Sequence, residues 1–223
     1  MPHTPAIALT LIALLAAGCA TVREAHMAQA ASVAGVAEEP FGKPGWGRRG
    51  EFMLSGQRVR YERSADRLSL FDTLASGRST LRYTWSGPAG DATADCTARQ
   101  AEATARGITA TVRPWTLNCR WSGASDAVLQ IGEGQVRRGQ STREGSYRRG
   151  ELTLGLRSVH LLEGSSLVQP SAVGYEMLHE GQVVASLDLA SGLPRLRRPD
   201  PATPLGRAAT EAALALALVW EPA

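Results

Sequence analysis

The sequence predicts a mainly β protein, an antiparallel barrel or sandwich packed around a C-terminal hydrophobic α-helix. Three observations carry this prediction. From about residue 51 onward, short runs alternate between apolar and polar side chains, and turns rich in Gly, Ser and Pro separate them. Cys96 and Cys119 both fall on the apolar side of such runs, and residues 204–220 replace the alternation with an almost wholly apolar stretch.

The alternating runs predict strands with one buried and one exposed face, because successive side chains of a strand point to opposite faces. In the first run, Val59 and Tyr61 alternate with Arg58, Arg60 and Glu62. The same pattern recurs in residues 81–85, 94–99, 108–113, 117–121, 152–156, 159–161, 173–177 and 183–189. The short turns between runs favour antiparallel pairing of consecutive strands. The pattern alone does not decide between a barrel and a sandwich.

Residues 204–220 are predicted to form a helix that starts with Thr203 as its N-cap and Pro204 in its first turn. Residues 212–220 contain no polar side chain on any face, and a helix that is apolar all round must be buried. It is too short to cross a bilayer. We therefore expect its second half inside the β-structure, with Pro222 marking its end.

A sheet wrapped around a terminal apolar helix resembles the tubby and LURP-one type of barrel, whose last element is a hydrophobic helix threaded through the barrel. The matching segments are residues 181–187, as a turn and strand, and residues 213–219, as the helix. The resemblance covers only the C-terminal part of the chain. It implies contact with phospholipid or phosphoinositide in some members, and no motif carries a binding residue over to this sequence.

Residues 1–18 are predicted to be a signal peptide. Residues 6–18 are uncharged and contain one hydroxyl, Thr10. As a helix this segment would be about 20 Å long, short of the roughly 30 Å hydrocarbon core of a bilayer, which argues against a permanent span. An apolar run followed by small residues is typical of an export signal.

Residues 15–19, L-A-A-G-C, resemble the lipobox of bacterial lipoproteins. In that family the signal is cut before the cysteine, so the resemblance implies that Cys19 is the first mature residue and carries acyl chains. In that family an Asp directly after the cysteine is the signal for retention in the inner membrane, and this sequence has Ala20 at that position. The resemblance therefore implies that the protein is anchored at the periplasmic face of the outer membrane. Two alternatives stay open: an ordinary secreted protein with an incidental cysteine, and a start at Met27 without a signal.

The remaining chain is predicted to hold a flexible tether over residues 19–50 and a single β-rich domain over residues 51–223. Residues 40–47, P-F-G-K-P-G-W-G, cannot hold a regular element. The chain has 223 residues and a net charge of +3, which allows one sizeable core and argues against binding a polyanion through bulk charge. Nucleic acid is not an expected partner of an exported protein.

Cys96 and Cys119 are an even pair once Cys19 is assigned to the lipid, and an exported chain favours a disulfide between them. The bridge would close a loop of about 24 residues and contribute roughly 3 kcal/mol in the chain-entropy model. The alternative is half of a metal site, but no His or Cys lies at ligand spacing.

Two groups of arginines are candidate contacts for an anion or a partner, because guanidinium groups pair well with phosphates and carboxylates. On a tethered domain the partners would be phospholipid headgroups, lipopolysaccharide phosphates or an acidic envelope protein. Solvated loops are the alternative. The candidates are Arg137, Arg138, Arg148 and Arg149 in the first group and Arg195, Arg197 and Arg198 in the second.

The sequence favours a non-enzymatic lipoprotein with a structural or binding role in the cell envelope. It contains no nucleophile elbow and no H-E-x-x-H motif, and no cofactor or metal is predicted. One alternative is an envelope enzyme whose residues converge from distant strands, with pairs of Asp and Glu, or His160 and His179 if they meet, as candidates. The other is a carrier of lipid or a small apolar ligand inside the barrel, which the terminal helix would fill.

Overall fold

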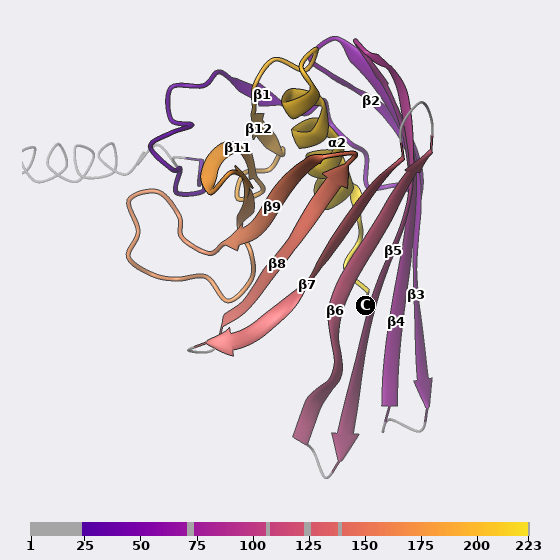
Figure 1. Ribbon diagram of the computed structural model, residues 1–223. Helices are drawn as coiled ribbons and strands as arrows, with labels where there is room; N and C mark the ends of the chain where they lie inside the picture. The colour runs from indigo at the N-terminus through magenta and orange to yellow at the C-terminus, as the bar shows by residue number, and fades with distance from the viewer. Residues whose placement is uncertain (1–23, 71–73, 106–107, 123–125, 138–139, 223) are drawn as a thin grey trace, which may run out of the picture.

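The computed structural model describes residues 24–70, 74–105, 108–122, 126–137 and 140–222. They form one antiparallel sheet of twelve strands that curls into a nearly closed barrel around helix α2 (Figure 1). The predicted fold class is confirmed. The strands are β1 (Glu38–Pro40), β2 (Arg49–Leu54), β3 (Gln57–Leu70), β4 (Leu74–Gly87), β5 (Gly90–Ala105), β6 (Ile108–Ser122), β7 (Ala127–Arg137), β8 (Gln140–Arg149), β9 (Leu152–Val159), β10 (Gly174–His179), β11 (Gln182–Asp188) and β12 (Arg195–Arg197), and α2 is Pro204–Leu218.

The sheet order is β1-β12-β11-β10-β9-β8-β7-β6-β5-β4-β3-β2. Every strand from β2 to β12 therefore lies beside its neighbours in sequence, and β1 lies beside β12. The two edges approach each other just after β1, where the N–H of Gly42 donates to the carbonyl of Met53 over 2.8 Å. A Cβ atom at Gly42 would lie 2.7 Å from that oxygen, so only glycine permits this contact.

Helix α2 runs through the interior of the barrel (Figure 1). Its start is as predicted, with the Thr203 hydroxyl accepting from the N–H of Gly206 over 3.1 Å. All residues from 208 to 216 are buried, so the barrel encloses most of the helix and not only its second half. The helix ends at Leu218, two positions before the predicted end, because Val219 is extended.

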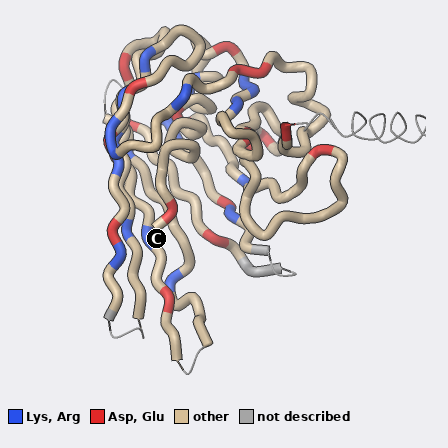
Figure 2. The backbone as a smooth tube through the Cα atoms, turned by 180° about the vertical axis from the view of Figure 1, so that it is seen from behind, with Lys and Arg blue, Asp and Glu red and all other residues tan. Residues whose placement is uncertain are grey.

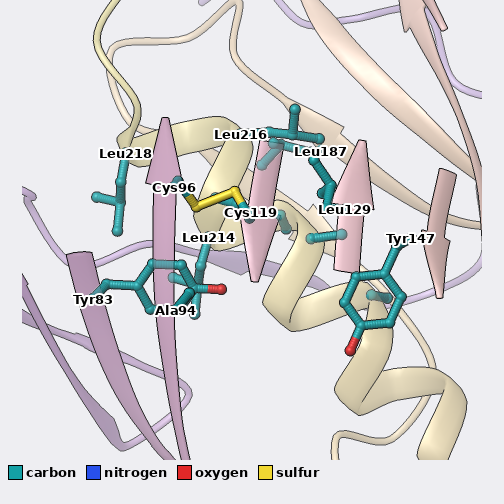
Figure 3. Packing of buried hydrophobic residues seen from close by; sticks show 14 of the residues in the cluster. Tyr83, Ala94, Cys96, Cys119, Leu129, Tyr147, Leu187, Leu214, Leu216 and Leu218 are labelled. Carbon is teal, nitrogen blue, oxygen red and sulfur yellow. A yellow bond between two sulfur atoms is a disulfide. The ribbon is translucent and has the colours of Figure 1, made fainter. Parts of the chain in front are cut away.

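The core forms between the inward side chains of the strands and the apolar faces of α2. Tyr83, Leu129 and Leu187 come from three strands and surround Leu214 and Leu216 (Figure 3). Burial of such side chains contributes about 25 cal/mol per Å² of apolar surface removed from water. The apolar residues of the helix therefore belong to the same core as the inward side chains of the strands.

Cys96 and Cys119 face each other directly across β5 and β6 and form a disulfide. Both are buried on the inner face beside the helix (Figure 3). The predicted cross-link between strands is present at this position.

The two ends of the barrel differ. At one end, which we call the turn end, tight turns join the strands, and the turns at residues 55–56 and 180–181 each place two consecutive residues at positive φ. The other end carries the longer connections 41–48, 160–173 and 189–194, together with the end of α2. We call it the long-loop end.

Four strands continue past the barrel at the long-loop end. The pairing of β2 with β3 stops at Glu62, and β7 pairs with β6 only from Thr116 onward. Beyond these points β3, β4, β5 and β6 form a projecting four-stranded sheet with two free edges (Figure 1). We call it the extension; it comprises residues 64–70, 74–80, 99–105 and 108–114.

Residues 24–50 are packed on the barrel, in contrast to the flexible tether that the sequence predicted for residues 19–50. Met27, Val33 and Phe41 are buried, and β1 pairs with β12. Isolated apolar residues without a periodic pattern gave no signal of this packing. Residues 1–18, the predicted signal peptide, and Cys19 lie outside the described residues.

Candidate functional site

The second group of candidate arginines holds the N-terminal segment on the barrel. Arg195 pairs with Glu24 and, over 2.7 Å, with Glu38. Arg197 pairs with the other oxygen of Glu38 over 2.9 Å. The anions that these arginines meet thus belong to the chain itself.

Arg198, the third member, is buried and pairs with Glu39 over 2.5 Å. Burial lowers its pKa, although Glu39 acts in the opposite direction. The three arginines of this group therefore form ion pairs with the acidic residues in and before β1. These ion pairs hold the N-terminal segment in place.

Two members of the first group, Arg148 and Arg149, lie on opposite faces of β8. Arg148 points outward and is exposed, whereas Arg149 points into the barrel. The side chain of Arg137 and the whole of Arg138 lie outside the described residues. The structure therefore does not unite this group into one described surface.

Arg149 belongs to a polar cluster around Glu211 of α2, which is 0% exposed. One carboxylate oxygen of Glu211 accepts hydrogen bonds from Arg149 and from the Tyr147 hydroxyl, each over 2.5 Å. The other accepts from Arg207 over 2.9 Å. Because both oxygens are occupied from within the chain, this cluster fixes the helix in the barrel.

The hydroxyl of Tyr83 donates to the backbone carbonyl of Glu211 over 2.6 Å and accepts from the indole N–H of Trp121 over 3.0 Å. Burial, and then the nearby Glu211 carboxylate, raise the pKa of Tyr83 well above its ordinary value. Burial and Glu211 also raise the pKa of Tyr147. Both tyrosines are therefore neutral hydrogen-bonding groups over the physiological pH range.

The two histidines of the enzyme alternative lie at opposite ends of β10. His160 follows β9 at the long-loop end and contacts the Ser158 hydroxyl and the Gln169 carbonyl. His179 ends β10 at the turn end. The structure does not bring them together.

A pocket of about 650 Å³ lies at the long-loop end, and we call it the Trp pocket. Its walls come from four segments that are distant in sequence: Arg63 of β3, the connections 41–48 and 189–194, and the end of α2 with the residues just after it. The volume falls within the range of small-molecule sites. Its lining is Lys43, Pro44, Gly45, Trp46, Arg63, Gly192, Leu193, Pro194, Ala217, Val219 and Trp220.

Trp46 stands at the rim of this pocket and is 95% exposed. A large aromatic side chain left in water forgoes a favourable burial and is typical of a contact surface. The indole of Trp220 also lines the pocket and packs against Arg63, whose guanidinium carbon is 4.5 Å from the ring centroid.

Arg63 gives the Trp pocket a positive wall. It is 7% exposed, and its guanidinium donates to the carbonyls of Gly45, Gly47 and Leu218 over 2.7, 3.2 and 3.0 Å. Among the described residues no carboxylate pairs with it. Burial lowers its pKa, because the charged form loses solvation.

A buried cation is normally paired with an anion, since the unpaired charge is costly away from water. The Trp pocket offers this cation together with the exposed ammonium of Lys43, and no acidic residue lines it in the part of the chain that the structure describes. The remaining lining is mostly apolar. Its chemistry suits a ligand with an apolar body and an anionic head.

Sequence reasoning missed Arg63, Trp46 and Trp220 as site residues. Arg63 falls on the apolar side of an alternating run, directly after Val59 and Tyr61 in the inward register. The only feature of the sequence that could have identified Arg63 is its position on the inward, otherwise apolar side of this strand. The two tryptophans lie in segments without periodicity.

No family model, no curated protein and no solved structure matches this chain. In the described part of the chain, no group of three or more His, Cys, Asp or Glu residues is arranged to hold a metal ion. Within the same ranges, no helix has the length and apolar character needed to span a membrane.

Proposed function

We propose that this protein is a lipid-anchored envelope protein with a non-enzymatic binding role, and that the Trp pocket is its binding site for an anionic amphiphile. Cys19 carries the acyl anchor, and the barrel stands on the periplasmic side of the outer membrane. The observation that carries the binding role is Arg63, a buried cation without a carboxylate partner among the described residues, in the wall of an aromatic pocket.

Two features of the fold support this proposal. The disulfide between Cys96 and Cys119 is typical of proteins outside the reducing cytosol. Helix α2 fills the barrel interior, so a binding site at the rim of the barrel is favoured and a ligand cavity inside the barrel is not. A phosphate or carboxylate head would meet Arg63 and Lys43, and an alkyl chain would lie against Trp46 and Trp220.

Binding is tested by titrating the protein with dodecyl phosphate below its micelle concentration, with dodecyl maltoside as the neutral probe of equal chain length. We expect saturable binding of dodecyl phosphate and at least tenfold weaker binding of the maltoside. Trp46→Ala and Lys43→Ala should each weaken dodecyl phosphate binding several-fold. Arg60→Ala, an exposed arginine on the outer face of β3, is the matched control and should leave it unchanged. Equal affinity for both probes would remove the anionic site.

The anchor is tested separately, by mass spectrometry of the protein extracted from membranes. We expect a mature N-terminus at Cys19 that carries acyl chains. An unmodified N-terminus at another position would exclude the anchor and leave the Trp pocket unaffected.

A further inference from the structure

The exposed large hydrophobic residues are concentrated at the long-loop end. Nine such side chains are exposed in the described part of the chain, and only Met53 lies near the turn end. Scattered exposed hydrophobic residues are normal, but their collection at one end of a molecule marks an interaction surface.

Three parts of the long-loop end carry these residues. Trp46 belongs to the connection 41–48. Leu68, Leu74, Ile108 and Val112 are on the extension.

Leu161, Leu167 and Val168 belong to the connection 160–173, where an isolated β-bridge joins Leu161 to Val168. Leu167 is 73% exposed. Three separate segments thus place apolar side chains in water at the same end of the barrel.

The extension also carries four exposed arginines, Arg67, Arg78, Arg99 and Arg113, against two acids, Asp66 and Glu102 (Figure 2). None of the four arginines forms an ion pair within the described ranges. Arg78 stands directly opposite Arg99 on β5 and directly opposite Asp66 on β3. Like charges in directly opposite positions are destabilising, and the single carboxylate of Asp66 offsets only part of the repulsion between the two arginines, so a further anion over them would be stabilising.

The described chain begins at this same end. The carbonyl of His26 accepts from the N–H of Glu163 over 2.8 Å, and the N–H of Ala28 donates to Leu161 over 2.9 Å. Cys19 precedes Glu24 by five residues, so the link between them spans at most about 18 Å even when extended. An acyl anchor at Cys19 would therefore hold the connection 160–173 close to the bilayer.

We propose that the long-loop end docks on the surface of an anionic bilayer. The apolar residues of the connection 160–173 and of the extension enter the interfacial region, and the arginines of the extension meet lipid phosphates. Basic residues near an anionic surface and apolar side chains buried in the interfacial region both contribute to membrane binding. This proposal rests on the acyl anchor of the proposed function and adds to it the face of the barrel that contacts the bilayer. In this orientation the mouth of the Trp pocket faces the lipid.

The test places an environment-sensitive nitrobenzoxadiazole label at Leu167→Cys or Ile108→Cys in the full-length acylated protein. The matched control is Met53→Cys, because Met53 is an exposed apolar residue at the turn end, 47% accessible. Each variant is reconstituted in vesicles of phosphatidylglycerol and phosphatidylcholine with and without doxyl-labelled lipid. We expect a blue shift and quenching by doxyl lipid at positions 108 and 167, and neither at position 53.

The arginine contribution is tested by the double variant Arg78→Gln/Arg99→Gln in the Ile108→Cys background. We expect it to lose at least half of the quenching, as high salt should also do. Arg58→Gln/Arg60→Gln removes the same charge near the turn end and should retain the quenching. Labels at 108 and 167 that stay unquenched while the protein floats with the vesicles would overturn the docked face and leave the anchor intact. Failure to float would overturn both.

Discussion

Arg149 and Glu211 form an ion pair inside the barrel, in which the guanidinium of Arg149 donates to the carboxylate of Glu211 over 2.5 Å. The two residues are separated by 62 positions in the sequence. The pair joins β8 to the middle of α2 at a point where the carboxylate has no access to water. It therefore helps to fix both the rotation and the depth of the helix, together with the hydrogen bonds from Tyr83 and Tyr147 to Glu211.

Glu211→Gln should destabilise the protein strongly. The substitution removes the anion from between Arg149 and Arg207 and leaves two largely buried cations uncompensated, a loss of about 3–5 kcal/mol by analogy with other broken buried pairs. The measurement is the free energy of unfolding in urea. Glu62→Gln, which breaks the exposed Arg49–Glu62 pair, is the control and should cost less than about 1 kcal/mol. Similar losses in the two variants would mean that the buried pair is not a structural fixing point.

The double variant Cys96→Ala/Cys119→Ala should unfold more easily by about 3 kcal/mol, because the disulfide closes a loop of 23 positions and its removal releases the entropy of the unfolded chain. The same shift should follow reduction of the native protein with dithiothreitol. Thiol titration of the unfolded, unreduced protein should find neither Cys96 nor Cys119 free. Titration of both thiols would show that the bond does not form.

Leu216→Asp should prevent stable folding, because Leu216 packs in the barrel interior and an aspartate there would be an unpaired buried charge costing several kcal/mol. Circular dichroism and thermal unfolding measure the effect. Leu167→Asp introduces the same change at an exposed leucine and should keep the native spectrum. A folded Leu216→Asp variant would place this part of α2 outside the barrel.

Acid should release the N-terminal segment from the barrel. Burial alone would raise the pKa of Glu38, but Arg195 and Arg197 outweigh it and hold the pKa below its ordinary value of 4.5. The ionised carboxylate thus favours the packed segment; its contribution is complete above pH 4.5 and is lost as the pH falls through the lower folded pKa.

Hydrogen exchange of residues 24–40 measures this release. We expect faster exchange in that segment on acidification below pH 4.5, after correction for intrinsic rates. Glu38→Gln should exchange faster already at neutral pH. A segment whose protection is the same in both proteins at every pH would show that Glu38 does not hold it.

The fold class followed from the sequence because its signals are local. Val59, Tyr61 and their inward neighbours repeat every second position, and residues 212–220 are apolar at every position of a helix. Such periodic patterns report directly on which face is buried. The cross-link of Cys96 to Cys119 followed in the same way, from the shared face of two runs.

The site and the ion pairs did not follow from the sequence because their parts are far apart in it. Arg198 and Glu39 are separated by 159 positions, and neither lies in a pattern that identifies the other. The Trp pocket is assembled from Arg63 of β3, two connections and the end of α2, and the two connections have no periodic pattern. The packing of residues 24–50 depends on single side chains such as Met27 and Phe41, which no pattern distinguishes from a linker.

Helix α2 follows all twelve strands in the chain, and yet the barrel is built around it. While the chain is being synthesised or exported, the strands emerge first with inward faces that have nothing to pack against. The native interior can form only after Leu218 has left the ribosome or the translocation channel. Folding must therefore be a late, nearly all-or-none event, and the strands need protection from aggregation until the last segment arrives.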